Sequence, residues 1–379
     1  MRILFISNYS DLYGANRSML TIIEHFKKKG DEVALILPKH GNIEETLVQK
    51  NIKYVVISCF TQLYYYKPQL KYLALPFLAM HTYFQLSKIE KYVCSFEPDL
   101  IYSNTSAENL GIKIAKRNGI KHISHIREFM DLDHDARFVY GRKKKKDYIN
   151  QSDGVIYVSN SVANHVNLGE PLKTWQKVIY NGVNTIDFAF SDKELPKELN
   201  LGIVGILDPE KGQDVAIRIL PTILKIYPNA RLHVWGDKVG KYKNSLYKMV
   251  DQMQISDSVV FHGFEKNPNV IYKDMDILMM CSRSEGFGRV TIEAMQRAIP
   301  VLGYNSGGTS ELVKNGINGY LFSSAEECVS GLQQLLCSKG EYNKVRRGAF
   351  NDSRANYSVE LYCSRVEDFV NFIMNNKIK

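Results

Sequence analysis

The sequence ILMMCSRSEGFGRVTIEAM at residues 277–295 joins a short apolar run to a glycine-containing loop and then to a helical segment. The run Ile277–Cys281 is too short for a helix and is typical of a buried strand. Gly286 and Gly288 allow the backbone to approach a ligand closely. Free N–H groups near Phe287 to Val290, where the predicted helix begins, favour an anion. This unit is therefore predicted to bind a phosphate-bearing ligand.

The same alternation of short apolar strands and longer helical segments continues in both directions from this unit. Predicted strands are Ile3–Ser7, Glu32–Leu37, Leu100–Ser103, Ile120–Ile126 and Gly154–Val158 in the first half, and Leu201–Gly205, Arg231–Trp235, Val259–Phe261, Ile277–Cys281 and Pro300–Gly303 in the second. Such alternation is typical of parallel sheets wound with helices. The fold class is therefore α/β.

Chain length and composition indicate two domains. A chain of 379 residues is too long for one typical core, and the polar, proline-containing stretch 191–200 separates the two sets of strands. We expect two facing Rossmann-like, doubly wound domains with the ligand in an interdomain cleft. The predicted N-terminal domain is 1–188 and the C-terminal domain is 189–355, while 356–379 form a helix that packs back on the N-terminal domain.

Charge and cysteine content narrow the class of protein. Lysine and arginine outnumber acids by 49 to 40, and residues 1–190 hold 25 basic against 18 acidic side chains. A nucleic-acid binder is disfavoured because no helix-turn-helix, zinc or aromatic RNA-binding pattern accompanies this excess. The six cysteines show no metal-ligand spacing and are expected to be reduced. The N-terminus lacks a secretory pattern, which predicts a cytoplasmic protein without a transmembrane segment.

Two carboxylates bracket the glycine loop. Glu285 lies in the loop, and Glu293 follows about a turn and a half into the predicted helix. Carboxylates bind sugar hydroxyls well because both oxygens accept hydrogen bonds. At this spacing the two groups are expected to contact different parts of one extended ligand.

This string resembles the Glu-x7-Glu motif of the retaining glycosyltransferase family 4, whose members have the two-domain GT-B fold. Later segments agree with the family in order and spacing, and the resemblance covers most of the chain. They are Ala298–Val301, Gly307–Val313 and Asn318–Phe322, and earlier matches are Gly14–Ala15, Asn181–Val183 and Lys211–Gly212. The resemblance implies a hexosyltransferase that uses a nucleotide-sugar, with no metal and no other cofactor.

The resemblance also implies roles for individual residues of the C-terminal half. Glu293 would bind the donor ribose, Glu285 a hydroxyl of the transferred sugar, and Lys211 the diphosphate. The remaining predicted donor contacts are Gly286, Phe287, Gly288, Arg289 and Val290. One departure stands out, because Ile206 occupies the position after Gly205 where the family usually has an arginine for the diphosphate. Arg283, Arg289 and Arg17 are the candidate substitutes.

In the N-terminal half, His125 ends a predicted strand at a position that we expect to face the cleft. The resemblance places a histidine there that contacts the transferred sugar or the acceptor; a core histidine is the alternative. His125, Glu285 and Lys211 are therefore the predicted catalytic residues. Gly14 is predicted to approach the diphosphate, and Asn104 and Arg127 are predicted to bind the acceptor.

The acceptor half also suggests a membrane partner. Aromatic residues and cations within 59–86, together with the lysine run 143–146, suit the headgroup zone of an anionic membrane. A core helix and a solvated charge run are the alternative. The implied reaction is hexose transfer to a saccharide or lipid-linked acceptor, as in bacterial surface polysaccharide biosynthesis. A GT-B epimerase or phosphorylase and, more distantly, a two-lobed sugar-binding protein remain open.

Overall fold

The computed structural model describes residues 1–58, 63–65, 71–105, 107, 110–133, 136–138 and 141–376, and for 63–65, 71–76, 78, 79 and 82 it describes the backbone alone. The chain divides into two compact units, Met1–Gly182 with Val359–Lys379, and Val183–Ser358. The domain boundaries predicted from the sequence were 188–189 and 355–356. Residues 183–188 join the second unit because the Val183 N–H donates to the Tyr357 carbonyl and Arg354 donates to the carbonyls of Ile186 and Phe188.

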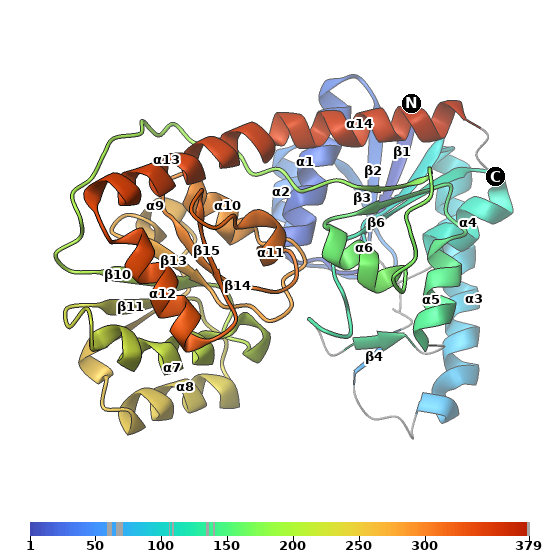
Figure 1. The fold of residues 1–379 in the computed structure, drawn as a ribbon. Helices are drawn as coiled ribbons and strands as arrows, with labels where there is room; N and C mark the ends of the chain where they lie inside the picture. Colours follow the sequence, from blue (N-terminus) through green and yellow to red (C-terminus); the bar gives the residue numbers. More distant parts are fainter. Residues whose placement is uncertain are drawn as a thin grey trace. The chain divides into compact units, whose positions relative to one another are not determined.

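The first unit contains a seven-stranded parallel sheet in the order β3-β2-β1-β5-β6-β8-β9 (Figure 1). Its strands are β1 (Arg2–Ile6), β2 (Glu32–Leu37), β3 (Lys53–Val56), β5 (Leu100–Ser103), β6 (Lys121–Ile126), β8 (Gly154–Tyr157) and β9 (Gln176–Val178). Its helices are α1 (Gly14–Lys28), α2 (Ile43–Gln49), α3 (Lys71–Phe96), α4 (Leu110–Asn118), α5 (Gly141–Ile149), α6 (Asn160–Val166) and α14 (Val359–Asn375). A two-stranded antiparallel sheet pairs β4 (Leu63–Tyr65) with β7 (Ala136–Phe138).

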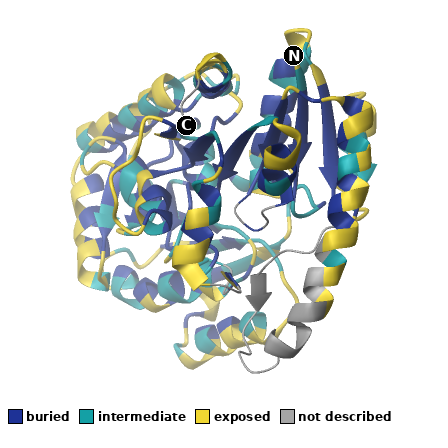
Figure 2. Ribbon diagram, turned by 90° about the vertical axis from the view of Figure 1, so that its right-hand side faces the viewer, coloured by how far each residue is buried: buried dark blue, intermediate teal, exposed yellow. Residues whose placement is uncertain are grey.

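The inner strands of this sheet are buried on both faces. In β2, residues 33–37 are all buried, and the central strands of the sheet are dark blue in Figure 2. This is the continuous apolar pattern expected of a parallel sheet. Helix α1 buries Met19, Ile22, Ile23 and Phe26 and packs beside α14.

The second unit contains a six-stranded sheet in the order β12-β11-β10-β13-β14-β15, whose paired strands are all parallel. Its strands are β10 (Asn200–Val204), β11 (Arg231–Trp235), β12 (Val259–Gly263), β13 (Ile277–Met280), β14 (Val301–Tyr304) and β15 (Gly319–Phe322). Its helices are α7 (Gln213–Leu224), α8 (Lys241–Gln252), α9 (Pro268–Ile271), α10 (Arg289–Met295), α11 (Thr309–Leu312), α12 (Ala325–Leu335) and α13 (Lys339–Asn356), with short 3-10 turns at Pro209–Lys211 and Ser256–Ser258.

Both sheets reverse their strand order at an internal strand. In the first unit β1 lies between β2 and β5, and in the second β10 lies between β11 and β13. In open α/β sheets, ligands bind outside the carboxyl ends of the strands at such a switch point. In the first unit, the topology therefore favours a ligand beside the chain that follows β1 and β5. In the second unit, it favours a ligand beside the chain that follows β10 and β13. None of the helices in the described part of the chain is long and apolar enough to span a membrane.

Candidate functional site

The switch point of the second unit brings Lys211 and Glu285 together. Lys211 follows β10, Glu285 follows β13, and the Lys211 Nζ lies 2.8 Å from the Glu285 Oε2. Gly212 makes this approach possible, because its φ is +69° and a Cβ there would stand 2.1 Å from the Cys281 carbonyl oxygen. Any L-residue with a side chain at 212 would push the two loops apart. The sequence thus predicted two residues that the fold places in direct contact.

The glycine loop after β13 is held from the other side by the loop before α11. The Gly308 N–H donates to the Glu285 carbonyl at 2.6 Å. Gly307 has a φ of +52°, and a Cβ there would stand 2.6 Å from the same carbonyl oxygen. Gly286, Phe287 and Gly288 are all buried, so this backbone is fixed by packing. Gly288, with a φ of +100°, is the N-cap of α10, whose first residues are Arg289 and Val290.

Glu293 is held on α10 by a residue that the sequence analysis missed. The buried Tyr272 hydroxyl donates to the Glu293 Oε2 at 3.2 Å. Arg297 donates to the Glu293 carbonyl and lies over the Tyr272 ring, 4.9 Å from its centroid. Burial first and the Glu293 carboxylate second raise the pKa of Tyr272 well above its usual range, so the hydroxyl stays a donor. A lone tyrosine before β13 carried no pattern in the sequence that pointed to this contact.

Cations around Ile206 are already engaged with acids. Ile206 itself is 41% exposed. Arg283, one predicted substitute for the missing arginine, is paired with Asp214 at 3.0 Å, and this hydrogen bond raises its pKa. Lys238, which the sequence analysis did not consider, pairs with Asp208 at 2.6 Å, two residues after Ile206. The segment after β11 can approach the segment after β10 because residue 236 is glycine. A Cβ there would stand 1.9 Å from the Gly205 carbonyl oxygen. Lys238 is therefore a cation beside the position that lacks the arginine.

The arrangement in the second unit suits a sugar nucleotide. Lys211 is a half-buried ammonium whose partner is a carboxylate, so a diphosphate can compete for it. Glu285 and Glu293 offer carboxylate oxygens for hydroxyls, and the start of α10 offers backbone N–H groups. The described residues contain no group of three potential metal ligands.

His125 on β6 is fully buried, contrary to the expectation that its side chain faces an open cleft. The Tyr102 hydroxyl lies 2.6 Å from its Nδ1, and the ring of Tyr362 on α14 lies 6.4 Å away. Burial, followed by the charge of Arg127, lowers the pKa of His125 well below its usual value. The Nε2 has no hydrogen-bond partner in the described part of the chain. His125 is therefore a buried core histidine, the alternative given in the sequence analysis. One of its ring nitrogens, Nε2, is left unsatisfied by the described residues.

Arg127 and Asn104, which were predicted to bind the acceptor, are also buried. The Arg127 guanidinium donates to the side-chain oxygens of Asn104 at 2.6 Å and Asn181 at 2.7 Å, and to the Tyr362 hydroxyl at 3.1 Å. Asn104, Arg127 and Asn181 are each at most 6% exposed. This cluster, which we call the Arg127 network, ties β5, β6, residue 181 and α14 into one core. Their acceptor-binding role stays a prediction.

Gly14 is the first residue of α1 rather than part of the preceding loop. It is exposed, as is Tyr13 before it. Asn16 anchors the start of the helix, since its amide donates to the carbonyls of Tyr9 and Asp11. Gly14 therefore lies at the carboxyl end of β1, at the switch point of the first unit.

Two protein-family models match the chain. The model for glycosyl transferases group 1 matches residues 186–352, and the model for Glycosyltransferase Family 4 matches residues 13–186. The fold is also that of solved structures that match nearly the whole chain. The Anabaena protein HepE in complex with UDP is 22% identical and has a TM-score of 0.81, over 98% of this chain and 100% of that one. A mutant of S. aureus TarM in complex with fondaparinux, alpha-GlcNAc-glycerol and UDP is 14% identical, with a TM-score of 0.76 over 99% and 100%.

Curated relatives match part of this chain and part of their own length. An uncharacterised glycosyltransferase of Methanocaldococcus jannaschii is 27% identical over 59% of this chain and 60% of its own. The N-acetyl-alpha-D-glucosaminyl L-malate synthase of Bacillus anthracis is 26% identical over 61% and 63%. The matches thus span about 60% of the relatives. With family models over both halves, the chain belongs to the glycosyltransferase family 4 proteins and has the GT-B type of fold.

Proposed function

We propose that the protein is a retaining hexosyltransferase that moves a sugar from a UDP- or GDP-sugar to a hydroxyl of a saccharide or lipid-linked acceptor. One observation carries the proposal, namely the contact of Lys211 with Glu285 at the switch point of the second unit. It combines a cation for a diphosphate with a carboxylate for a hydroxyl at the place where the topology favours a ligand. Glu293, fixed by Tyr272, supplies a second carboxylate on the following helix.

The roles follow from the chemistry of each group. Lys211 and the N–H groups at the start of α10 would stabilise charge on the leaving diphosphate. Lys238 would add the second cation that Ile206 does not provide, after exchanging Asp208 for a phosphate oxygen. Glu285 would bind a hydroxyl of the transferred sugar, and Glu293 the ribose. His125 as a contact to sugar or acceptor, and Asn104 and Arg127 as acceptor residues, stay within the proposal.

In the proposed reaction the bond from the sugar C1 to the phosphate oxygen breaks, and a bond from C1 to the acceptor oxygen forms on the same face. The acceptor proton passes to the departing phosphate oxygen, so the products are the glycosylated acceptor and a nucleoside diphosphate. No metal is assigned to the step, because Lys211 and the helix N–H groups are proposed to stabilise the charge of the leaving diphosphate.

The relatives support the class of substrate. The similar structures are complexes with UDP, with UDP-glucose or with a glycerol-linked sugar, which favours a nucleotide-sugar donor and a hydroxyl acceptor. A Staphylococcus aureus relative, 24% identical, is named poly(ribitol-phosphate) alpha-N-acetylglucosaminyltransferase, in keeping with a role in bacterial surface polysaccharide synthesis. The proposal includes a cytoplasmic location, since Cys281, Cys328 and Cys363 are buried free thiols that suit a reducing compartment.

Incubation with radiolabelled UDP- and GDP-hexoses tests the proposal. Transfer predicts that label moves to added saccharide or lipid-linked acceptors and that nucleoside diphosphate appears in equal amount. Conversion of the sugar without any acceptor would instead show an epimerase, and release of a sugar phosphate with inorganic phosphate would show a phosphorylase. Binding without turnover of any donor would leave a sugar-binding protein.

A further inference from the structure

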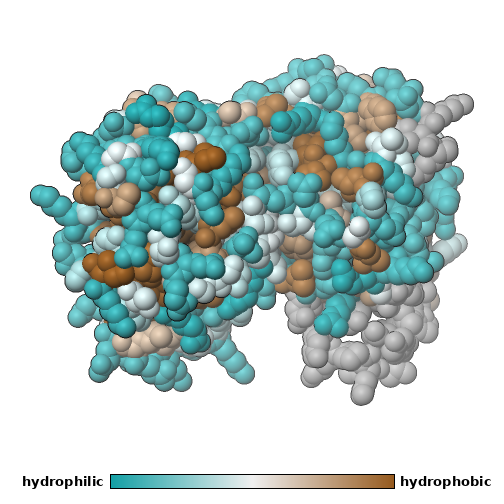
Figure 3. Space-filling view, in the orientation of Figure 1, coloured by the Kyte–Doolittle hydropathy of each residue, from teal (hydrophilic) through white to brown (hydrophobic). Residues whose placement is uncertain are grey.

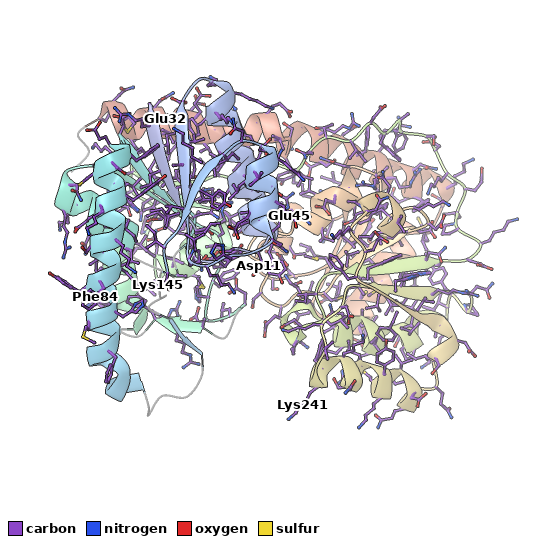
Figure 4. The ribbon with its side chains drawn as sticks, turned by 180° about the vertical axis from the view of Figure 1, so that it is seen from behind. Asp11, Glu32, Glu45, Phe84, Lys145 and Lys241 are labelled. Carbon is purple, nitrogen blue, oxygen red and sulfur yellow. The ribbon has the colours of Figure 1, made fainter. Side chains whose placement is uncertain are left out.

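Helix α3 has one face in the core and one face in solvent. Its buried positions in the later turns recur at helical spacing and include Leu86, Ile89, Val93 and Phe96. On the opposite side four large apolar residues are exposed, Phe77 at 70%, Met80 at 56%, Tyr83 at 67% and Phe84 at 60%. We call these four residues the α3 stripe. Figure 4 shows Phe84 on α3 pointing outward from the molecule.

The α3 stripe is large for a surface without a partner. Phe77, Met80 and Phe84 follow the spacing i, i+3 and i+7, so they form one row about 10 Å long. Since a large aromatic side chain has roughly 150–250 Å² of surface, the four expose on the order of 400–500 Å². That approaches the largest apolar patch of a typical monomer, and such patches mark interaction sites. Figure 3 shows apolar patches scattered among hydrophilic side chains on the face in view.

The row of exposed residues on α3 continues into cations. Lys88 and Lys91 are exposed at the positions i+11 and i+14 from Phe77, so they extend the same face by about two turns. Glu90 is the one acidic residue in the sequence from 77 to 96. It lies to the side and is paired with Arg117 of α4 at 3.0 Å. The face therefore presents apolar surface and positive charge.

We propose that this face of α3 docks on an anionic lipid membrane, with the α3 stripe in the headgroup and acyl boundary and Lys88 and Lys91 against acidic headgroups. Apolar aromatic side chains together with nearby lysines favour binding to the interface of an anionic membrane. A second copy fits less well, because a two-fold contact would gather four lysines with no acidic side chain on the face to meet them. The inference rests on the proposed function only for its purpose, which is to hold the enzyme near a lipid-linked acceptor.

The structure also changes which lysines serve this surface. The run 143–146 on α5 was expected to contribute as a block, but Lys145 and Lys146 are both buried. Lys146 pairs with Glu170, and burial lowers the pKa of Lys145. The aromatic segment 59–76 lies outside the residues whose side chains the structure describes. The surface is therefore assigned to α3.

Flotation with vesicles tests the proposal. We expect wild type to float with phosphatidylcholine vesicles that contain phosphatidylglycerol at low salt, and to bind pure phosphatidylcholine vesicles at least tenfold more weakly. The triple variant Phe77→Ser, Met80→Ser, Phe84→Ser should bind the acidic vesicles at least tenfold more weakly than wild type. Each substitution removes apolar surface that the membrane would bury. Lys88→Gln with Lys91→Gln should lose about thirtyfold, and high salt should abolish the difference.

A matched control carries three exposed apolar changes in the second unit, Val239→Ser, Phe264→Ser and Val270→Ser. It should float like wild type, and all variants should keep the wild-type melting temperature and affinity for nucleotide. No flotation of wild type at low salt, or equal flotation of the α3 triple variant, would overturn the proposal. So would a wild-type dimer in light scattering that the α3 triple variant converts to a monomer, since that outcome assigns the surface to a second copy. If wild type does not bind any nucleotide, that result would count against the proposed function alone.

Discussion

The two units place their predicted residues in opposite environments. At the switch point of the second unit, Lys211 and Glu285 are partly exposed and neutralise each other. In the first unit, His125, Arg127 and Asn104 also meet, but they are buried in the Arg127 network. An ion pair near solvent can exchange its partner for a ligand at small cost, whereas a buried guanidinium cannot lose its partners cheaply. The Lys211–Glu285 pair of the second unit is therefore suited to binding a ligand, whereas the Arg127 network of the first unit also stabilises the fold.

The largest expected effect separates these two roles by activity. Lys211→Ala should lower kcat/KM for sugar transfer by about 10²–10³, because it removes a preorganised positive charge that stabilises the leaving diphosphate. Steady-state kinetics with saturating acceptor measures it. Lys241→Ala is the matched control, since Lys241 is an exposed lysine of the same unit and points outward in Figure 4. Equal rates for the two variants would remove Lys211 from the donor site.

A second variant tests the structural role of the Arg127 network. Arg127→Met should lower the free energy of unfolding by about 3 kcal/mol, because four side-chain partners lose a charged donor inside the core. Urea denaturation measures the change, and UDP affinity of the folded protein should stay within about twofold. Arg117→Met, which removes the exposed pair with Glu90, should cost under about 1 kcal/mol. A stable Arg127→Met protein would contradict this account of the first unit.

His125 gives the network a pH dependence. Burial keeps the imidazole neutral in the native state, so the unfolded chain takes up a proton first as pH falls below about 6.5. Stability should be highest above that pH and fall by up to about 1.4 kcal/mol per pH unit below it. His125→Asn should have a smaller slope between about pH 6.5 and 5 in urea denaturation. Because the pKa values of His233 and His262 are also lowered, the difference between variant and wild type is the quantity that matters.

The smallest expected effect concerns positioning in the second unit. Tyr272→Phe removes the hydroxyl that holds Glu293 and should weaken donor binding by about 1 kcal/mol, close to fivefold. Calorimetry with UDP and with its deoxyribose analogues checks it. If Tyr272 acts through Glu293 and Glu293 binds the ribose, the loss should vanish for the analogue that lacks the bound hydroxyl. Tyr247→Phe, half-exposed in the same unit, is the control. A uniform loss for every nucleotide would mean a purely structural tyrosine.

Strand positions could be predicted because burial on both faces makes parallel strands continuously apolar. The predicted strands Glu32–Leu37, Leu100–Ser103 and Arg231–Trp235 have these bounds in the structure. Edge strands β3, β9 and β15 were not predicted as strands, nor were the paired strands β4 and β7. β9 is three residues long with a lysine in its middle, which leaves little pattern to detect.

The site could be predicted in its motif residues but not in its contacts. Lys211 and Glu285 are 74 residues apart, and only the sheet order and Gly212 bring them together. Tyr272 and Lys238 were missed because a lone tyrosine or lysine carries no pattern until its partner is known. His125 was expected to be accessible, but α14, from the far end of the chain, contributes Tyr362 to its surroundings.

The central claim is that the switch point of the second unit binds the donor nucleotide, and titration calorimetry of Glu293→Ala tests it most directly. Wild type should bind at least one of UDP, GDP and ADP or their hexose conjugates, and Glu293→Ala should bind the same ligand at least tenfold more weakly, since a charged hydrogen bond is lost. Its melting temperature without ligand should stay close to that of wild type. Failure of wild type to bind any of these nucleotides, or equal affinity of the two proteins, would contradict the account.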